Sequence, residues 1–123
     1  MELASKILLK ENFNINLTYT YTDSVQFNND AYVDEVRRPR NIGSMKVLWK
    51  KDEYSFLNLN VQYADKQIDV VYPENVILPS YTLLNLGAGF LLNDKLTLNI
   101  SFNNLLNESY EEIYGYRGIG FNV

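Results

Sequence analysis

The chain contains neither cysteine nor histidine. Without cysteine there is no disulfide framework and no thiolate chemistry. Without histidine the chain lacks the most frequent general base and the most frequent metal ligand. No apolar run reaches the length of about 18 residues that a transmembrane helix needs. The formal net charge is only −4, which argues against a nucleic-acid partner. We therefore expect no cofactor and no enzymatic activity.

Alternation of apolar and polar residues is the main pattern in the sequence. The stretch NFNINLTYTYT, residues 12–22, shows it most clearly, because every second residue is apolar and the residues between are Asn or Thr. Its apolar positions are Phe13, Ile15, Leu17, Tyr19 and Tyr21. Side chains in a strand point alternately to opposite faces, so this stretch is predicted to form a β-strand with one apolar and one polar face.

The same period of two recurs along the chain and predicts six long strands. These are residues 2–10, 12–22, 44–50, 57–63, 83–91 and 96–103, and a further strand beginning near Gly118 would make seven. Short joins near residues 10–11, 50–53 and 93–94 alternate with long ones at 23–40, 64–80 and 104–118. Tight turns at one end and long loops at the other are typical of outer-membrane barrels. We predict an all-β fold, an antiparallel up-and-down meander of about six or seven long strands within a transmembrane β-barrel.

The composition of the polar faces bears on whether this meander lies in a membrane. A soluble barrel turns its apolar face inward and usually covers its outside with charged residues, whereas a membrane barrel turns its apolar face to lipid. The polar faces of residues 12–22, 57–63 and 96–103 carry Asn, Thr, Gln and Ser with almost no charge. Tyrosines also lie toward strand ends, as they do at lipid–water boundaries. The pattern favours a membrane barrel, with a soluble lipocalin-like ligand-binding β-barrel as the alternative.

The stretch NLLNESYEEIYGY, residues 104–116, resembles the segment before the last strand of TonB-dependent outer-membrane receptors. That segment commonly reads N-[LF]-[FL]-[DN]-x-x-Y, followed by a Tyr/Gly pair. The matching residues here are Asn104, Leu105, Leu106, Asn107, Tyr110, Tyr114, Gly115 and Tyr116. The preceding DKLTLNISFNNLLN resembles the penultimate strand of the family, and RRPR (37–40) resembles an R-x-P element that opens a late strand. The resemblance covers essentially the whole chain, is most specific over residues 95–116, and is nearest to the cobalamin and siderophore branches.

The resemblance implies active uptake of a scarce, bulky nutrient, a siderophore–iron complex or a corrinoid, across the bacterial outer membrane. In such receptors a plug domain occludes a barrel of about 22 strands, and a TonB-type energy-coupling protein of the inner membrane pulls on the plug. This sequence shows no signal peptide, no plug and no final strand ending in an aromatic residue. We therefore expect residues 1–123 to form one C-terminal segment of such a barrel. Another kind of outer-membrane barrel protein is a second alternative.

The long loops of such a receptor face the outside, and their residues can contact the ligand. The candidate ligand-contacting residues are Tyr72, Tyr110, Tyr114, Tyr116 and Arg117. Tyrosines in such positions are more often packing or interfacial groups, so both interpretations apply to them. No catalytic, cofactor-binding or metal-binding residue is predicted.

Several other polar groups have a structural interpretation beside a functional one. Glu111 and Glu112 are adjacent, so in extended chain they point to opposite sides and do not form one carboxylate site. The acids Asp30, Asp34 and Glu35 lack the spacing of a calcium loop and are expected to be solvated. Arg37, Arg38 and Arg40 suit either phosphate binding or strand entry. The GAG stretch at 87–89 is expected to mark close packing or a bend within a strand.

Overall fold

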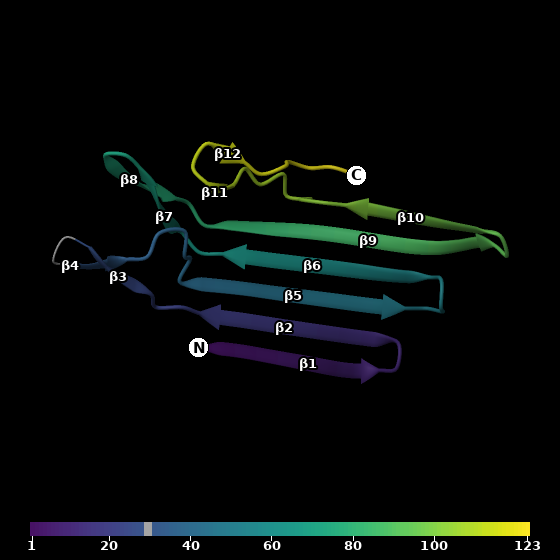
Figure 1. Ribbon diagram of the computed structural model, residues 1–123. Helices are drawn as coiled ribbons and strands as arrows, with labels where there is room; N and C mark the ends of the chain where they lie inside the picture. The colour runs from purple at the N-terminus through teal and green to yellow at the C-terminus, as the bar shows by residue number, and fades with distance from the viewer. Residues whose placement is uncertain (29–30) are drawn as a thin grey trace.

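Six long strands form one antiparallel sheet in the computed structural model, which describes residues 1–28 and 31–123. In sheet order they are β1 (Glu2–Lys10), β2 (Phe13–Tyr21), β5 (Asn41–Lys50), β6 (Phe56–Ala64), β9 (Tyr81–Asn93) and β10 (Leu96–Phe102). Each strand pairs with the next along the sheet, as Figure 1 shows. The predicted antiparallel meander is therefore confirmed. Within the described ranges, no helix is long and apolar enough to cross a membrane.

The three predicted long loops each contain a short β-hairpin. These hairpins are β3 (Val25–Asn28) with β4 (Ala31–Asp34), β7 (Gln67–Val71) with β8 (Glu74–Leu78), and β11 (Glu111–Ile113) with β12 (Tyr116–Arg117). All three lie at the same end of the sheet, and the tight turns lie at the other end (Figure 1). Beyond Gly118 the chain forms no further long strand, although Asn122 pairs with Asn103 through an isolated antiparallel bridge.

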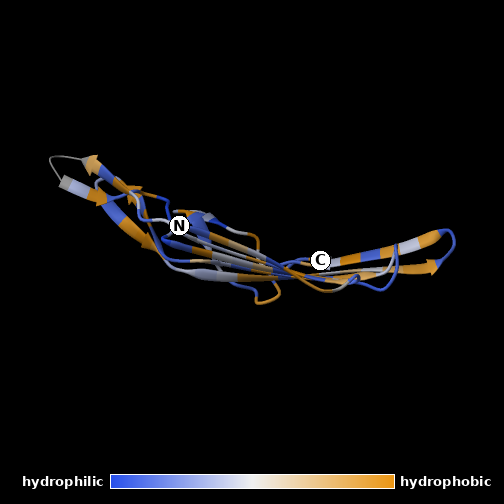
Figure 2. Cartoon of the chain, turned by 90° about the horizontal axis from the view of Figure 1, so that it is seen from below, coloured by the Kyte–Doolittle hydropathy of each residue, from blue (hydrophilic) through white to orange (hydrophobic). Residues whose placement is uncertain are grey.

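The register of the six strands sorts their side chains into two different faces. One row runs across the whole sheet and is entirely apolar: Ile7, Ile15, Val47, Leu59, Leu86 and Phe102. A neighbouring row on the other face is entirely polar: Lys6, Asn16, Lys46, Asn60 and Asn85. Figure 2 shows the sheet edge-on as a single thin layer, with hydrophobic and hydrophilic residues alternating along its strands. The alternation read from the sequence is therefore a property of the folded sheet.

The sheet does not bury its apolar face against any other part of the described chain. Among the residues whose burial the structure describes, the buried hydrophobic ones are Ala64 and Leu78. Leu17 and Leu98, which a soluble barrel would seal in a dry interior, are 36% and 42% exposed. The sheet is also open, because β1 and β10 are its two edges. These features do not fit a closed lipocalin-like barrel, and they leave a broad apolar surface that needs a nonaqueous environment or a partner.

Two glycines of β9 make room for bulky side chains of β6. In the register, Gly87 lies opposite Asn58 and Gly89 lies opposite Phe56. A Cβ built on Gly87 would lie 2.5 Å from Asn58 Nδ2, and one on Gly89 would overlap the Phe56 ring. The GAG stretch therefore marks close packing between neighbouring strands.

Candidate functional site

The end of the sheet that carries the three hairpins is called here the hairpin end. Asp69 in β7 connects several of its segments through hydrogen bonds. It is 1% exposed, the least accessible side chain in the described chain. Its Oδ1 accepts hydrogen bonds from Arg37 Nε and from the backbone N–H of Val70, both at 2.8 Å. Its Oδ2 accepts a hydrogen bond from the backbone N–H of Tyr114 at 2.8 Å. One carboxylate therefore joins the β4–β5 connection, the β7–β8 hairpin and the β11–β12 hairpin.

The local backbone brings Arg37 to this carboxylate. Arg37 has a φ of 57°, a left-handed conformation that reverses the chain direction, and its N–H donates to the Ile68 carbonyl at 2.7 Å. The Tyr114 N–H, and next the Arg37 guanidinium, lower the pKa of Asp69 below its ordinary value, although burial opposes them. Asp69 is therefore ionised at neutral pH, and its charge is matched by donors from two other segments.

The β11–β12 hairpin is also hydrogen-bonded to β7 and to the first residue of β9. Gln67 Nε2 donates to the Glu112 carbonyl at 2.8 Å, and the Tyr81 hydroxyl donates to Glu112 Oε1 at 3.0 Å. The rings of Tyr81 and Tyr110 pack with centroids 4.7 Å apart. A Cβ on Gly118 would overlap the Tyr110 ring, so this glycine lets the ring lie against the backbone. Tyr110 is therefore a packing residue in this structure.

Asn104 organises the turn that follows β10. It is 4% exposed and has a φ of 50°, a conformation that Asn tolerates better than most residues. Its side-chain Oδ1 accepts from the Glu108 N–H at 2.8 Å, and its Nδ2 donates to the carbonyls of Glu108 and Ile119 at 2.9 and 3.1 Å. Its own N–H donates to Asn85 Oδ1 at 2.8 Å. The first Asn of the NLLN motif thus joins β9, the turn and the segment after β12.

Three of the predicted ligand-contacting tyrosines are open to solvent at the hairpin end. Tyr72, at the turn between β7 and β8, is 94% exposed, Tyr116 in β12 is 75% exposed, and Tyr114 is 49% exposed. Arg117 is also exposed, and its Nε lies 3.9 Å from Glu111 Oε1. The structure brings Tyr114, Tyr116 and Arg117 together on one hairpin, with β11 against β8 of the hairpin that carries Tyr72.

The arginines of the β4–β5 connection are each paired with an acid. Beside the Arg37–Asp69 pair, Arg40 Nη2 lies 2.9 Å from Asp34 Oδ1, and Arg38 Nε lies 3.4 Å from Glu35 Oε2. The predicted strand-entry role of these arginines has a physical basis, since they tie the connection before β5 to nearby carboxylates. Asp34 and Glu35 are ion-paired rather than simply solvated, and Asp30 lies outside the described residues.

A polar cavity of about 280 Å³ lies between the β3–β4 and β7–β8 hairpins. Its lining includes Asp34, Arg38, Arg40, Asp65, Lys66 and Gln67. Asn41 Nδ2 donates to Asp65 Oδ2 at 2.7 Å and is the main cause that lowers the pKa of Asp65. The cavity therefore offers a polar ligand cationic hydrogen-bond donors and anionic hydrogen-bond acceptors.

The two adjacent glutamates of β11 have separate partners. Glu111 Oε2 accepts from the Gly115 N–H at 2.9 Å, whereas Glu112 engages Tyr81 on the sheet. The two carboxylates do not form a shared site. In the part of the chain that the structure describes, no three acidic side chains are grouped to hold a metal ion.

The sequence interpretation missed Asp69, the central residue of this end. Its only local signal is an acid within the apolar run QIDVV, where an unpaired charge would be unfavourable on burial. That signal indicates that a partner is required. It does not identify Arg37, which lies 32 residues earlier in the chain.

The chain belongs to the TonB-dependent receptor-like β-barrel family, whose family model matches residues 1–105. Its fold is similar to that in the crystal structure of the siderophore receptor PiuA from Acinetobacter baumannii, with a TM-score of 0.76 and 19% sequence identity. This match covers 98% of the present chain and 20% of the receptor chain, so the chain spans about a fifth of the length of that receptor. No curated protein matches the sequence.

Proposed function

We propose that this chain forms part of the barrel wall and outer loops of an outer-membrane receptor that imports a scarce, bulky nutrient. The observation that carries the proposal is the two-faced six-stranded sheet with all three hairpins at one end, in a chain of this receptor family. The apolar rows would face lipid acyl chains, and the Asn- and Lys-bearing rows would face the lumen. In this proposal residues 1–123 are one C-terminal segment of a larger barrel, and the protein is a transporter component rather than an enzyme.

The polar face would lie against the plug of the complete receptor. Its Lys6–Asn85 row carries two lysines among amides and no acid. These side chains offer ammonium and amide donors and amide acceptors to the groups of the plug. A TonB-type energy-coupling protein would act through that plug, and the hairpin end would face the outside of the cell.

We propose that the exposed tyrosines of the hairpin end contact the incoming ligand. Tyr72, Tyr114 and Tyr116 present aromatic surface that can stack on a catecholate, a heteroaromatic ring or a corrin, and Arg117 can pair with an acidic group. Tyr110 belongs to the same segment but is held against Tyr81, so its contribution would be to support the hairpin. An iron–siderophore complex or a corrinoid is the ligand class that fits this surface.

Uptake by the bacterium that encodes this receptor tests the proposal. The gene would be deleted, and the uptake of a panel of ⁵⁵Fe-loaded siderophores and of radiolabelled cyanocobalamin would be measured with and without dissipation of the proton motive force. We expect the deletion to abolish energy-dependent uptake of one member of the panel, and a plasmid copy to restore it. Unchanged uptake of every compound, or recovery of the protein outside the outer-membrane fraction, would contradict the proposal.

A further inference from the structure

Three glycines lie inside the long strands, and one of them differs from the other two. Gly87 and Gly89 in β9 are covered by Asn58 and Phe56. Gly43 in β5 is not covered, because a Cβ built there would meet only the Thr18 carbonyl oxygen, at 4.0 Å. Glycine within a strand weakens it, and often marks a place where a ligand or another backbone approaches closely. The space above Gly43 is therefore available to something outside the described chain.

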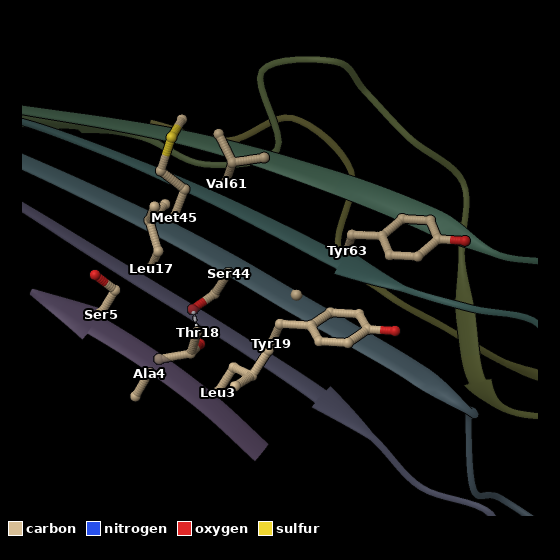
Figure 3. A pocket seen from close by; sticks show the side chains of 11 residues that line it. Leu3, Ala4, Ser5, Leu17, Thr18, Tyr19, Ser44, Met45, Val61 and Tyr63 are labelled. Carbon is tan, nitrogen blue, oxygen red and sulfur yellow. Dashed lines mark hydrogen bonds between the residues drawn. The ribbon is translucent and has the colours of Figure 1, made fainter. Parts of the chain in front are cut away.

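That space forms a groove on the apolar face. In the register, Gly43 lies between Tyr19 of β2 and Tyr63 of β6. The next row on the same face is Ser5, Leu17, Met45 and Val61, and Leu3 of β1 extends the lining beside Tyr19. The groove has a volume of about 610 Å³, and no charged side chain of the described chain lines it. Figure 3 shows the Tyr19 and Tyr63 rings extending in the same direction, with Met45, Leu17 and Val61 farther along the strands on the side away from the ring hydroxyls.

Two polar groups of the groove, the tyrosine hydroxyls, lie together at one end, whereas Thr18 and Ser44, which also line it, are hydrogen-bonded to each other through their hydroxyls at 2.7 Å. The hydroxyls of Tyr19 and Tyr63 point the same way (Figure 3), and the Tyr19 hydroxyl donates to Asn41 Oδ1 at 2.7 Å. Asn41 begins β5 at the hairpin end of the sheet. An occupant that matches this lining is apolar along its length and polar at the end near the hairpins. A lipid has this distribution, with an acyl chain below a polar headgroup.

We propose that the groove over Gly43 binds one acyl chain of a membrane lipid between Tyr19 and Tyr63. The inference rests on the proposed membrane location of the apolar face, and adds a defined site to it. Gly43 provides the depth, the two tyrosines provide the sides, and their hydroxyls lie where the headgroup begins. The bound lipid would fill a gap that the chain itself leaves open in its apolar surface.

Gly43→Val is a suitable test because the new side chain occupies the floor of the groove, where an added Cβ meets no atom closer than 4.0 Å. Its Cβ has 4.0 Å of clearance, and β-branched residues favour strands, so the sheet is expected to fold normally. The matched control is Ala88→Val, which adds bulk to the same face in β9, outside the groove. The full-length receptor and both variants would be placed in nanodiscs of dimyristoylphosphatidylglycerol, released into detergent, and examined by native mass spectrometry for retained lipid.

We expect the wild-type receptor and Ala88→Val to retain one lipid, and Gly43→Val to retain it in a fraction reduced by roughly tenfold. Equal retention by the wild type and Gly43→Val would overturn the proposal. A wild-type dimer that Gly43→Val converts to a monomer would also overturn it, and would assign the groove to a second copy. If all three proteins fail to enter nanodiscs, the proposed membrane location fails as well, which separates that failure from loss of the groove alone.

Discussion

The Asp69 carboxylate accepts a hydrogen bond from Arg37 Nε at 2.8 Å and, through its other oxygen, one from the Tyr114 N–H at the same distance. Asp69 is inaccessible to solvent, whereas the Arg37 side chain is 51% exposed. The Asp69 side chain is therefore the more constrained partner of this ion pair. Because its two oxygens accept from segments far apart in the sequence, we expect a change at this residue to affect both the β4–β5 connection and the β11–β12 hairpin.

Asp69→Asn should loosen the β11–β12 hairpin. The amide keeps the size of the side chain but loses the charge that pairs with Arg37, and it offers only one acceptor oxygen to the donors that now surround two. We expect hydrogen-exchange protection of the Tyr114 amide to fall by roughly tenfold, as for a lost charge-assisted hydrogen bond. Asp94→Asn, in the turn at the opposite end of the sheet, is the control, and equal protection in both variants would refute the expectation.

The same junction should weaken under acid conditions. The pKa of Asp69 is lowered in the folded chain, so its stabilising contribution is complete above the unfolded-state pKa of about 3.9. The contribution is lost as the pH falls below that value and through the lowered folded-state pKa. The measurement is the ratio of Tyr114 protection in the wild type to that in Asp69→Asn at each pH. We expect a ratio well above one at neutral pH that approaches one in strong acid, whereas a constant ratio would exclude titration of Asp69.

Asn104 offers a test that separates backbone conformation from side-chain bonding. Asn104→Gly removes the side-chain hydrogen bonds but accepts the φ of 50°, whereas Asn104→Ala removes the bonds and also strains the backbone. We expect both variants to be less stable than the wild type, with Ala worse than Gly by roughly 1–2 kcal/mol. Urea unfolding of the receptor refolded in lipid would measure the order. Equal stability of the Gly and Ala variants would show that the left-handed conformation is not retained.

The exposed tyrosines should affect ligand affinity without affecting folding. Tyr72→Ala and Tyr116→Ala each remove an exposed ring at the hairpin end, and we expect each to weaken binding of the transported ligand by roughly tenfold. Tyr54→Ala is the control, because Tyr54 is 51% exposed but lies in the turn between β5 and β6 at the opposite end. Titration calorimetry with the ligand found in the uptake experiment would measure the affinities. Unchanged affinity in both hairpin variants would remove these tyrosines from the binding surface.

The long strands could be predicted because their signal is local and long. In β2 the alternation extends over nine residues, and the same period in β6 and β10 follows from the requirement that each face meets a different environment. The short hairpins could not be predicted in the same way. β7 and β8 have five residues each, too few to distinguish alternation from a mixed loop.

The candidate site was only partly predictable for a related reason. The NLLN stretch stood out through its resemblance to the segment before the last strand of the family, but the hydrogen bonds that Asn104 makes in the turn after β10 could not be predicted from it. The pairing of Arg37 with Asp69 depends on how two separate hairpins stand above the sheet, and no spacing in the sequence encodes that. Tyr110 was grouped with the exposed tyrosines because residue type alone does not reveal the room that Gly118 leaves for its ring.

The two glycines of β9 also determine which strand alignment can form. A slip of one residue between β6 and β9 would turn the apolar side chains of one strand to the polar face. Such a slip is unfavourable because the two faces meet different environments. A slip of two residues would keep the faces, so another discriminator is needed. Only the observed alignment sets Phe56 opposite Gly89 and Asn58 opposite Gly87 at once. The steric fit of Phe56 and Asn58 against the two glycines thus selects a single register between these strands while the barrel wall assembles.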